Sequence, residues 1–174
     1  MARRRYRRYR RRKVSYSPNI IRIGPNSYNI AAQTRDVMSI TLIENQAYDP
    51  SRSNSIITVK NPELSIEFES EYPILEAATA YILYVPEGYT TTIDTPTQHP
   101  EWIMAYKFFG SPNIERTSET GPQTTKPIQR IKSRLARKLN TGDRIVLLVE
   151  ASNIGGTTQQ LQYQGLCRWW TKAN

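Results

Sequence analysis

The segment Leu64-Ser-Ile-Glu-Phe-Glu69 decides the fold class, because its apolar and polar side chains alternate without a break. Alternation with a period of two puts the three apolar side chains on one face of an extended chain and the three polar ones on the other. The segment is therefore predicted to be a half-buried β-strand. Further along, Arg144-Ile-Val-Leu-Leu-Val-Glu150 is the most hydrophobic of the predicted strands.

Turn residues divide the rest of the chain into short segments with the composition of strands. Pro86-Glu-Gly88 and Asn140-Thr-Gly-Asp143 are turn sequences, in which glycine can adopt a positive φ. Residues 111–127 hold three prolines and are predicted to be an exposed loop. Seven or eight strands without a long helix predict a β-sandwich or a β-barrel. The other predicted strands are residues 36–44, 55–60, 77–85, 101–109 and 159–171.

Residues 128–139 fit two kinds of secondary structure. Apolar residues recur at every fourth position at Ile131, Leu135 and Leu139, which is helical spacing. Basic residues occupy every second position from residue 130 to residue 134, which is strand spacing. Because the neighbouring segments are predicted strands, a strand is favoured over a helix.

The excess positive charge of the chain lies at its beginning. The 174 residues carry a formal net charge of +9, from 24 basic and 15 acidic residues. Nine of the basic residues fall within residues 1–13, which contain no acid, so the remaining 15 basic residues balance the 15 acidic ones. Like charges at this density repel one another and cannot bury apolar surface. The sequence predicts a disordered arm over residues 1–13, a connector with at most one short extended piece over residues 14–34, and a folded domain over residues 35–174.

The arm has the chemistry of a segment that binds nucleic acid. Guanidinium groups pair with phosphates and stack on bases, and binding that neutralises phosphates weakens steeply with salt. Two tyrosines within the run could stack on unpaired bases, at about 1–3 kcal/mol per base. The alternative is a solvated run of charge that serves only solubility or nuclear import. The predicted binding residues are Arg3, Arg4, Arg5, Tyr6, Arg7, Arg8, Tyr9, Arg10, Arg11, Arg12 and Lys13.

A second candidate for nucleic-acid binding lies in the body of the chain. On a strand, the side chains of Arg130, Lys132 and Arg134 would share one face and could line a nucleic-acid surface. The alternative is an exposed strand whose cations are balanced by nearby acids. The two are distinguished by whether these side chains lie on the same side of the domain as the arm.

Little in the chain indicates catalysis. The single histidine, His99, lies in a predicted loop, and no motif marks the single cysteine, Cys167, or any serine as an activated nucleophile. There is no Cys/His cluster for zinc and no glycine-rich phosphate motif. No stretch approaches the roughly 20 apolar residues of a membrane span. We therefore expect no enzymatic activity, no cofactor, no metal and no membrane insertion.

Several segments resemble capsid proteins of small circular Rep-encoding single-stranded DNA viruses, the circovirus-like group. Residues 2–12 (Ala-Arg-Arg-Arg-Tyr-Arg-Arg-Tyr-Arg-Arg-Arg) resemble the arm that opens those proteins. The resemblance spans most of the chain, which is shorter than typical circovirus capsid proteins. Three segments of the body are also similar to such capsids: Tyr84-Val-Pro-Glu-Gly-Tyr89, His99-Pro-Glu-Trp-Ile-Met-Ala-Tyr-Lys107 and Arg134-Leu-Ala-Arg-Lys-Leu-Asn-Thr-Gly-Asp143.

This resemblance implies a fold, an assembly and a location. The fold would be a single jelly roll of eight antiparallel strands in two sheets. Sixty copies would form a T=1 icosahedral shell, with the arms facing the lumen and binding packaged single-stranded DNA. The protein would be found in the virion and, during assembly, in the host nucleus, with nuclear import machinery and a cell-surface receptor as further partners. The residues alone leave two alternatives open: a capsid protein that packages RNA, and a cellular nucleic-acid-binding protein with a basic tail.

Overall fold

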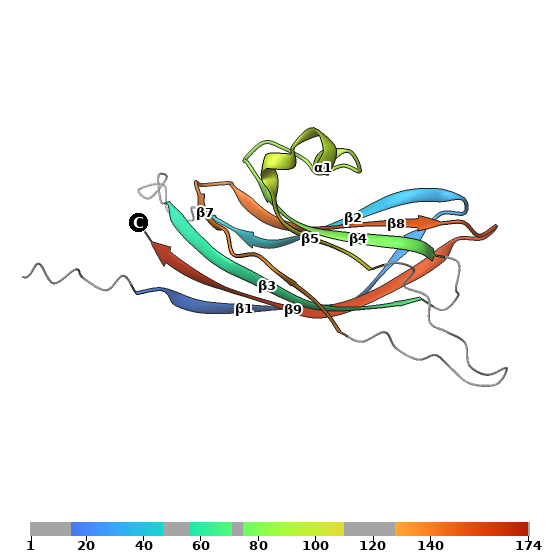
Figure 1. The fold of residues 1–174 in the computed structure, drawn as a ribbon, viewed down its shortest axis with the longest axis horizontal. Coiled ribbons are helices and arrows are strands. Elements are labelled where there is room, and N and C mark those ends of the chain that lie inside the picture. The colour runs from blue at the N-terminus through green and yellow to red at the C-terminus, as the bar shows by residue number, and fades with distance from the viewer. Residues whose placement is uncertain (1–14, 47–55, 71–74, 110–127, 174) are drawn as a thin grey trace, which may run out of the picture.

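The computed structural model describes residues 15–46, 56–70, 75–109 and 128–173. Most of these residues are in antiparallel strands, which form two stacked sheets (Figure 1). The predicted all-β fold is therefore confirmed. The elements are β1 (Ser17–Ile30), β2 (Thr34–Glu44), β3 (Ile57–Ser70), β4 (Leu75–Val85), α1 (Thr95–Gln98), η2 (Pro100–Trp102), β5 (Ile103–Phe108), β6 (Gln129–Lys132), β7 (Ala136–Leu139), β8 (Arg144–Asn153) and β9 (Gln159–Ala173).

The strand order is that of a jelly roll. One sheet has the order β1-β9-β3-β6, with β7 also paired to β3, and the other has the order β2-β8-β4-β5. Every pairing is antiparallel. When β6 and β7 are taken as one interrupted strand, each sheet has four strands. This is the eight-stranded double-sheet arrangement of a jelly roll, and it confirms the prediction of a jelly-roll sandwich.

The break between β6 and β7 matches a bulge in β3. The register of β3 shifts between Lys60 and Glu63, and Asn61 in the bulge has a φ of 50°. Opposite the bulge, the hydroxyl of buried Ser133 donates to the Met104 carbonyl at 2.9 Å and accepts a hydrogen bond from the Leu135 amide at 3.1 Å. The break thus keeps its buried hydroxyl satisfied. The prediction of strand rather than helix for this region is confirmed.

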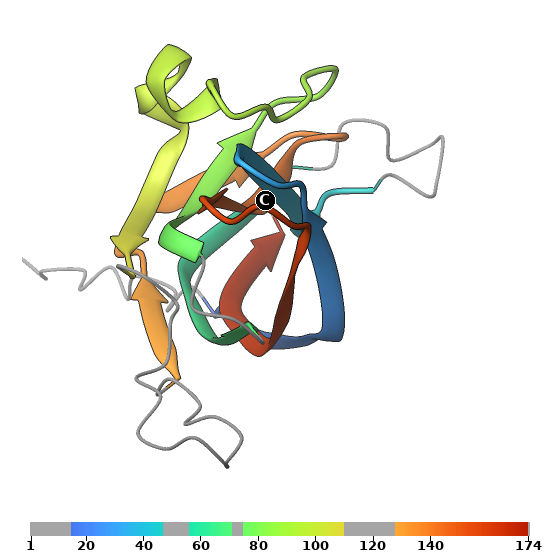
Figure 2. The same ribbon diagram turned by 90° about the vertical axis from the view of Figure 1, so that its right-hand side faces the viewer.

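The main core lies between the two sheets (Figure 2). Alternate residues point into it from each strand, among them Leu64, Ile66 and Phe68 of β3 and Leu147 and Val149 of β8. Full burial of side chains of this size stabilises the fold by about 1.5–3 kcal/mol each, relative to exposure. The alternation predicted over residues 64–69 is confirmed over its first five residues, because Leu64, Ile66 and Phe68 are buried whereas the two residues between them are half-buried.

A second, smaller apolar cluster lies on the outer side of β4 and β8. The segment 86–102, which contains α1 and η2, passes over this part of the sheet (Figure 1). Because the inner side of β8 is also buried, this strand is covered on both faces, and a doubly covered strand carries a continuous apolar run. The buried members of the cluster are Leu83, Val85, Trp102, Val146 and Leu148.

The prediction of a connector over residues 14–34 is wrong for most of that segment. Residues 17–30 form β1, an edge strand that pairs with β9 along its length. The turn-forming pair Gly24-Pro25 produces a shift of register within the strand rather than a loop, and Gly24 has a φ of 65°. Proline is compatible with this position because an edge strand has a side without ladder partners.

Two predicted segments, the arm over residues 1–13 and the loop over residues 111–127, lie outside the described residues. Within the described ranges, neither α1 nor any other helix has the length and apolar character needed to cross a membrane.

Candidate nucleic-acid interface

The outer face of the β1-β9-β3-β6 sheet, here called the basic face, gathers cations from five strands. Alternation identifies its residues, because neighbours in sequence of the core residues Ile23, Leu64, Ile131 and Cys167 point to the opposite side. Among the described side chains, the acids of this face are Glu63 and Glu67, so cations outnumber acids. The cations are Arg22, Lys60, Arg130, Lys132, Lys138, Arg168 and Lys172.

Strand pairing arranges these side chains in rows across the face. Adjacent strands lie about 4.8 Å apart, so the Cα atoms of residues on β1 and β6 in one row are separated by roughly 14 Å. The first row, from β1 to β6, is Arg22, Leu166, Ser65 and Arg130. The next row is Ile20, Arg168, Glu63 and Lys132. Each row therefore carries two cations, and only the second also carries an acid.

Glu63 lies between the two cations of its row. Its carboxylate is 3.0 Å from Nη2 of Arg168 and 3.6 Å from Nζ of Lys132. The hydrogen bond from Arg168, helped by the charges of both cations, lowers the pKa of Glu63 although its burial acts in the opposite direction. In the first row, Arg22 and Arg130 form no ion pair with any described side chain. These two arginines are thus free to pair with an external anion.

The residue that precedes β1 also lies over the basic face. The amino group of Lys60 is 5.6 Å from the centroid of the Tyr16 ring, which is a cation–π contact. Lys60 is on β3, where it pairs with Trp170 of β9, and β9 lies between β3 and the edge strand β1. The contact between Tyr16 and Lys60 therefore passes over β9. The chain three residues after Lys13 is therefore held on the basic face.

Two of the three predicted body residues lie on the basic face. Arg130 and Lys132 are exposed on either side of buried Ile131 in β6, as strand spacing requires. Arg134 is exposed but lies in the break between β6 and β7, so it is not part of a paired row. The eleven arm residues from Arg3 to Lys13 lie outside the described residues, and their role stays a prediction.

The sequence pattern did not predict that β1, β3 and β9 also contribute cations to this face. Alternation around Cys167 could have placed Arg168 on the outer side of the strand predicted over residues 159–171, and the observed strand extends far enough to include Lys172 on the same side. Alternation along one strand does not reveal which strands are neighbours, however. Arg22 and Arg130 come into one row only through the pairing of four strands that are far apart in the sequence.

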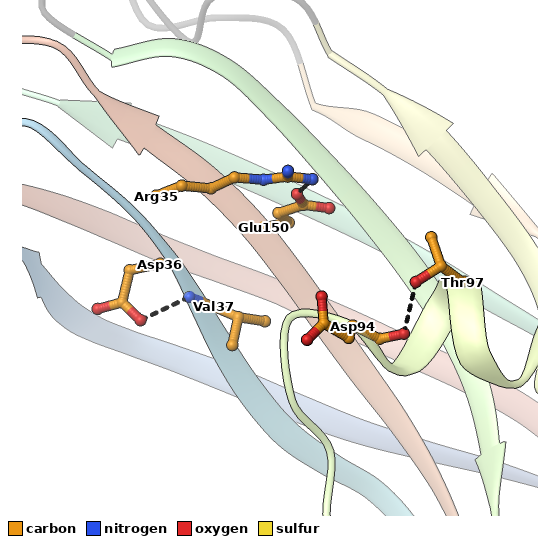
Figure 3. Close-up of polar contacts among 6 residues, drawn as sticks. All are labelled: Arg35, Asp36, Val37, Asp94, Thr97 and Glu150. Carbon is orange, nitrogen blue, oxygen red and sulfur yellow. Dashed lines mark hydrogen bonds and ion pairs between the residues drawn. The ribbon is translucent and has the colours of Figure 1, made fainter.

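On and around the β2-β8-β4-β5 sheet, several polar groups form contacts within the fold (Figure 3). Arg35 and Glu150 form an ion pair across β2 and β8. The Val37 amide donates to the Asp36 carboxylate at 2.7 Å, and the Thr97 hydroxyl in α1 donates to the Asp94 carbonyl at 2.8 Å. Of these contacts, the Arg35–Glu150 pair is the one in which opposite charges compensate each other.

The strand β5 carries exposed aromatic side chains at the edge of the same sheet. Tyr106 is 68% exposed and Phe108 is 62% exposed, and the rings of Tyr81 and Tyr106 lie 6.2 Å apart. Trp102, by contrast, is buried in the second apolar cluster. Exposed aromatic residues at a sheet edge are typical of surfaces that contact another protein.

The single histidine and the single cysteine have surroundings that explain them structurally. The His99 ring stacks on Trp102 with centroids 3.9 Å apart, and its Nδ1 is 3.2 Å from the Glu101 carboxylate. Cys167 is fully buried, and burial raises the pKa of its thiol to about 12, which leaves it without nucleophilic thiolate at neutral pH. In the part of the chain that the structure describes, no three His, Cys, Asp or Glu side chains are grouped to hold a metal ion.

Comparison with known proteins gives weak structural likenesses only. No protein-family model and no curated protein matches the sequence. A chain of the infectious bursal disease virus VP2 subviral particle is 15% identical, with a TM-score of 0.41, over 88% of this chain and 32% of that one. A second structure of infectious bursal disease virus, of the Gx strain, is 13% identical, with a TM-score of 0.36, over 90% of this chain and 32% of that one.

A structure of Desmodium yellow mottle tymovirus is 13% identical, with a TM-score of 0.33, and the match covers 90% of each chain. The protein thus spans about a third of the two infectious bursal disease virus chains it matches. With identities of 13–15% and TM-scores below 0.5, these likenesses do not indicate what the present chain binds or what it assembles into.

Proposed function

We propose that this protein is a viral capsid protein that assembles into a small icosahedral shell and packages single-stranded DNA. The observation that carries the proposal is the basic face, which lies on one side of a jelly roll and contacts Tyr16, three residues after the end of the arginine-rich arm. Jelly rolls of eight strands build many viral capsids. The sequence resemblance to circovirus-like capsid proteins points to the same function.

The distribution of charge suits a shell that closes around a polyanion. The body of the chain is neutral, so neighbouring subunits can pack without long-range repulsion. The arms, in contrast, need an anionic partner when they are crowded together. Sixty copies with nine arm cations each would place roughly 540 positive charges in the lumen, which could pair with a similar order of phosphates. Packaging and assembly would then drive each other, because a closed shell raises the local concentration of arms.

In this proposal the two sheets have different roles in the shell. The basic face lies toward the lumen and continues the cationic surface of the arm through Arg22 and Arg130. The exposed aromatic residues Tyr106 and Phe108 contribute to contacts between copies. The protein has no enzymatic role, and it is located in the virion and, during assembly, in the host nucleus.

The proposal is tested by expressing the full chain and a variant that lacks residues 1–13. The full chain is expected to form uniform particles by negative-stain microscopy and to co-purify with nucleic acid. The truncated chain is expected to keep its β-sheet circular dichroism spectrum, because the folded strands begin at Ser17, and to lose most of the nucleic acid.

Three outcomes would contradict parts of the proposal. A full chain that stays monomeric at every salt concentration and pH, with and without nucleic acid, rules out the shell. Retention of nucleic acid by the truncated chain at every ionic strength rules out the arm as the packaging element. Cargo that is digested by ribonuclease and resists deoxyribonuclease replaces DNA with RNA.

A further inference from the structure

We propose that a hollow on the basic face binds one unpaired base of the packaged strand, and that it prefers a base with an exocyclic amino group. This inference rests on the proposed function and names a nucleotide site on the folded body. The hollow has a volume of about 410 Å3 and lies over β9, between β1 and β3. That volume is in the range of sites for small molecules, about 300–1,000 Å3.

Two apolar side chains line the hollow, and part of its floor is backbone. Leu166 is 48% exposed and Ile128 is 62% exposed, and both line the hollow. Gly165 contributes backbone to the floor, because it pairs with the core residue Ile66 and its side-chain position is on the core side of the sheet. A flat ring could therefore contact the aliphatic side chains of Leu166 and Ile128 above a backbone floor. Apolar contact with the face of a base is tolerant of sequence, because every base has such a face.

Glu67 gives the hollow its chemical preference. It lines the hollow on a face that is otherwise cationic, and among the described side chains it has no cationic partner. Its carboxylate accepts a hydrogen bond from the Gln164 amide at 3.1 Å, which leaves further acceptor capacity. A carboxylate repels phosphate but accepts hydrogen bonds from the N4 amine of cytosine, where thymine and uracil present a carbonyl oxygen.

The cations around the hollow suit the phosphates on either side of the base. Arg22 lines the hollow on β1, and Arg130 lies in the same row on β6, at a Cα separation of roughly 14 Å. Neither arginine forms an ion pair with a described side chain. This charge also disfavours the arm as the occupant, because a cationic segment would be repelled. The complementary ligand is a polyanion with apolar rings, which is single-stranded nucleic acid.

The test compares two oligonucleotides that differ in the exocyclic group. The full chain is stripped of nucleic acid in high salt, and the unassembled fraction is isolated by size exclusion. Fluorescence anisotropy at pH 7.5 then measures its affinity for dC10 and dT10. We expect dC10 to bind at least about fivefold more tightly than dT10, which is the effect of one good hydrogen bond to a base edge. We expect Glu67→Gln to abolish this ratio, because an amide can serve either base.

One further variant tests the contacts with the phosphates, and another serves as its control. The double variant Arg22→Ala/Arg130→Ala is expected to weaken binding of both oligonucleotides by the same factor. The matched control Lys107→Ala removes one cation from the β2-β8-β4-β5 sheet and is expected to change neither affinity beyond the small effect of net charge.

The results distinguish failure of the hollow from failure of the proposed function. Equal affinities for dC10 and dT10 in a chain that still binds both would overturn the proposal that the hollow recognises a base. They would leave the proposed packaging function intact. A preference for dC10 that survives Glu67→Gln unchanged also overturns the hollow. A full chain that binds neither oligonucleotide overturns packaging itself. Variants that change assembly but not oligonucleotide affinity would make this face a contact between copies, which also overturns the hollow.

Discussion

The outer faces of the two sheets of this jelly roll differ in how far the described chain covers them. On the β2-β8-β4-β5 side, the segment 86–102 covers an apolar cluster that includes Leu148, and the Arg35–Glu150 pair neutralises charge. On the β1-β9-β3-β6 side, no described segment covers the strands, and exposed side chains include Leu166 and several cations. One face is covered by a described segment of the chain, whereas none of the described segments covers the other.

This difference shows how one fold can keep stability and binding apart. Residues that stabilise the covered face are apolar and buried on both sides of β8, so their removal should affect folding. Residues of the basic face are exposed and charged, so their removal should affect binding and little else. A small number of substitutions on each face can therefore separate the two effects.

The largest difference in stability is expected when one leucine on each face is truncated to alanine. Leu148→Ala removes a fully buried side chain under the segment 86–102 and should lower the free energy of unfolding by about 2–5 kcal/mol. Leu166→Ala removes a half-exposed side chain from the basic face and should cost less than about 1 kcal/mol. Urea unfolding of the unassembled subunit measures both values. A Leu166→Ala variant that loses as much stability as Leu148→Ala would mean that the basic face is covered within the chain.

The sequence predicts where the strands lie better than it predicts which residues gather on each face of a sheet. The all-β class and the alternation over residues 64–69 follow from local pattern, because buried and exposed positions alternate along each strand. The first strand was missed because Gly24-Pro25 is a turn signal, and only pairing with β9 turns it into a bulge. Only part of the candidate site could be predicted from the sequence, for a similar reason. Arg130 and Lys132 show strand spacing, but their proximity to Arg22 depends on the order of strands in the sheet.

An intermediate effect is expected from the one acid that is paired on the basic face. Glu63→Gln removes the carboxylate that binds Arg168 and Lys132 and should lower the free energy of unfolding by about 1 kcal/mol at neutral pH, since both partners are largely exposed. The pKa of Glu63 is lowered in the folded state, so its contribution is complete above the unfolded pKa and is lost as the pH falls through the folded one. The difference between wild type and variant should therefore shrink below about pH 4.5.

The measurement for Glu63 is urea unfolding of both chains at pH 7 and at pH 3. Glu44→Gln is the matched control, because Glu44 is an exposed carboxylate without an ion pair among the described residues, and it should change stability by less than about 0.5 kcal/mol. A Glu63 variant whose deficit is the same at both pH values would show that the ion pairs do not stabilise the basic face.

The smallest effect concerns the contact that holds the start of the folded chain on the basic face. Tyr16→Leu keeps an apolar side chain but removes the ring over which Lys60 lies, and Lys60→Met removes the cation. An exposed cation–π contact contributes about 0.5–1 kcal/mol, so each variant should lose roughly that much. The double variant should lose no more than either single one, since the two changes remove the same contact. Fully additive losses would mean that Tyr16 does not rest on this face, and the link between the arm and the basic face would then lose its structural support.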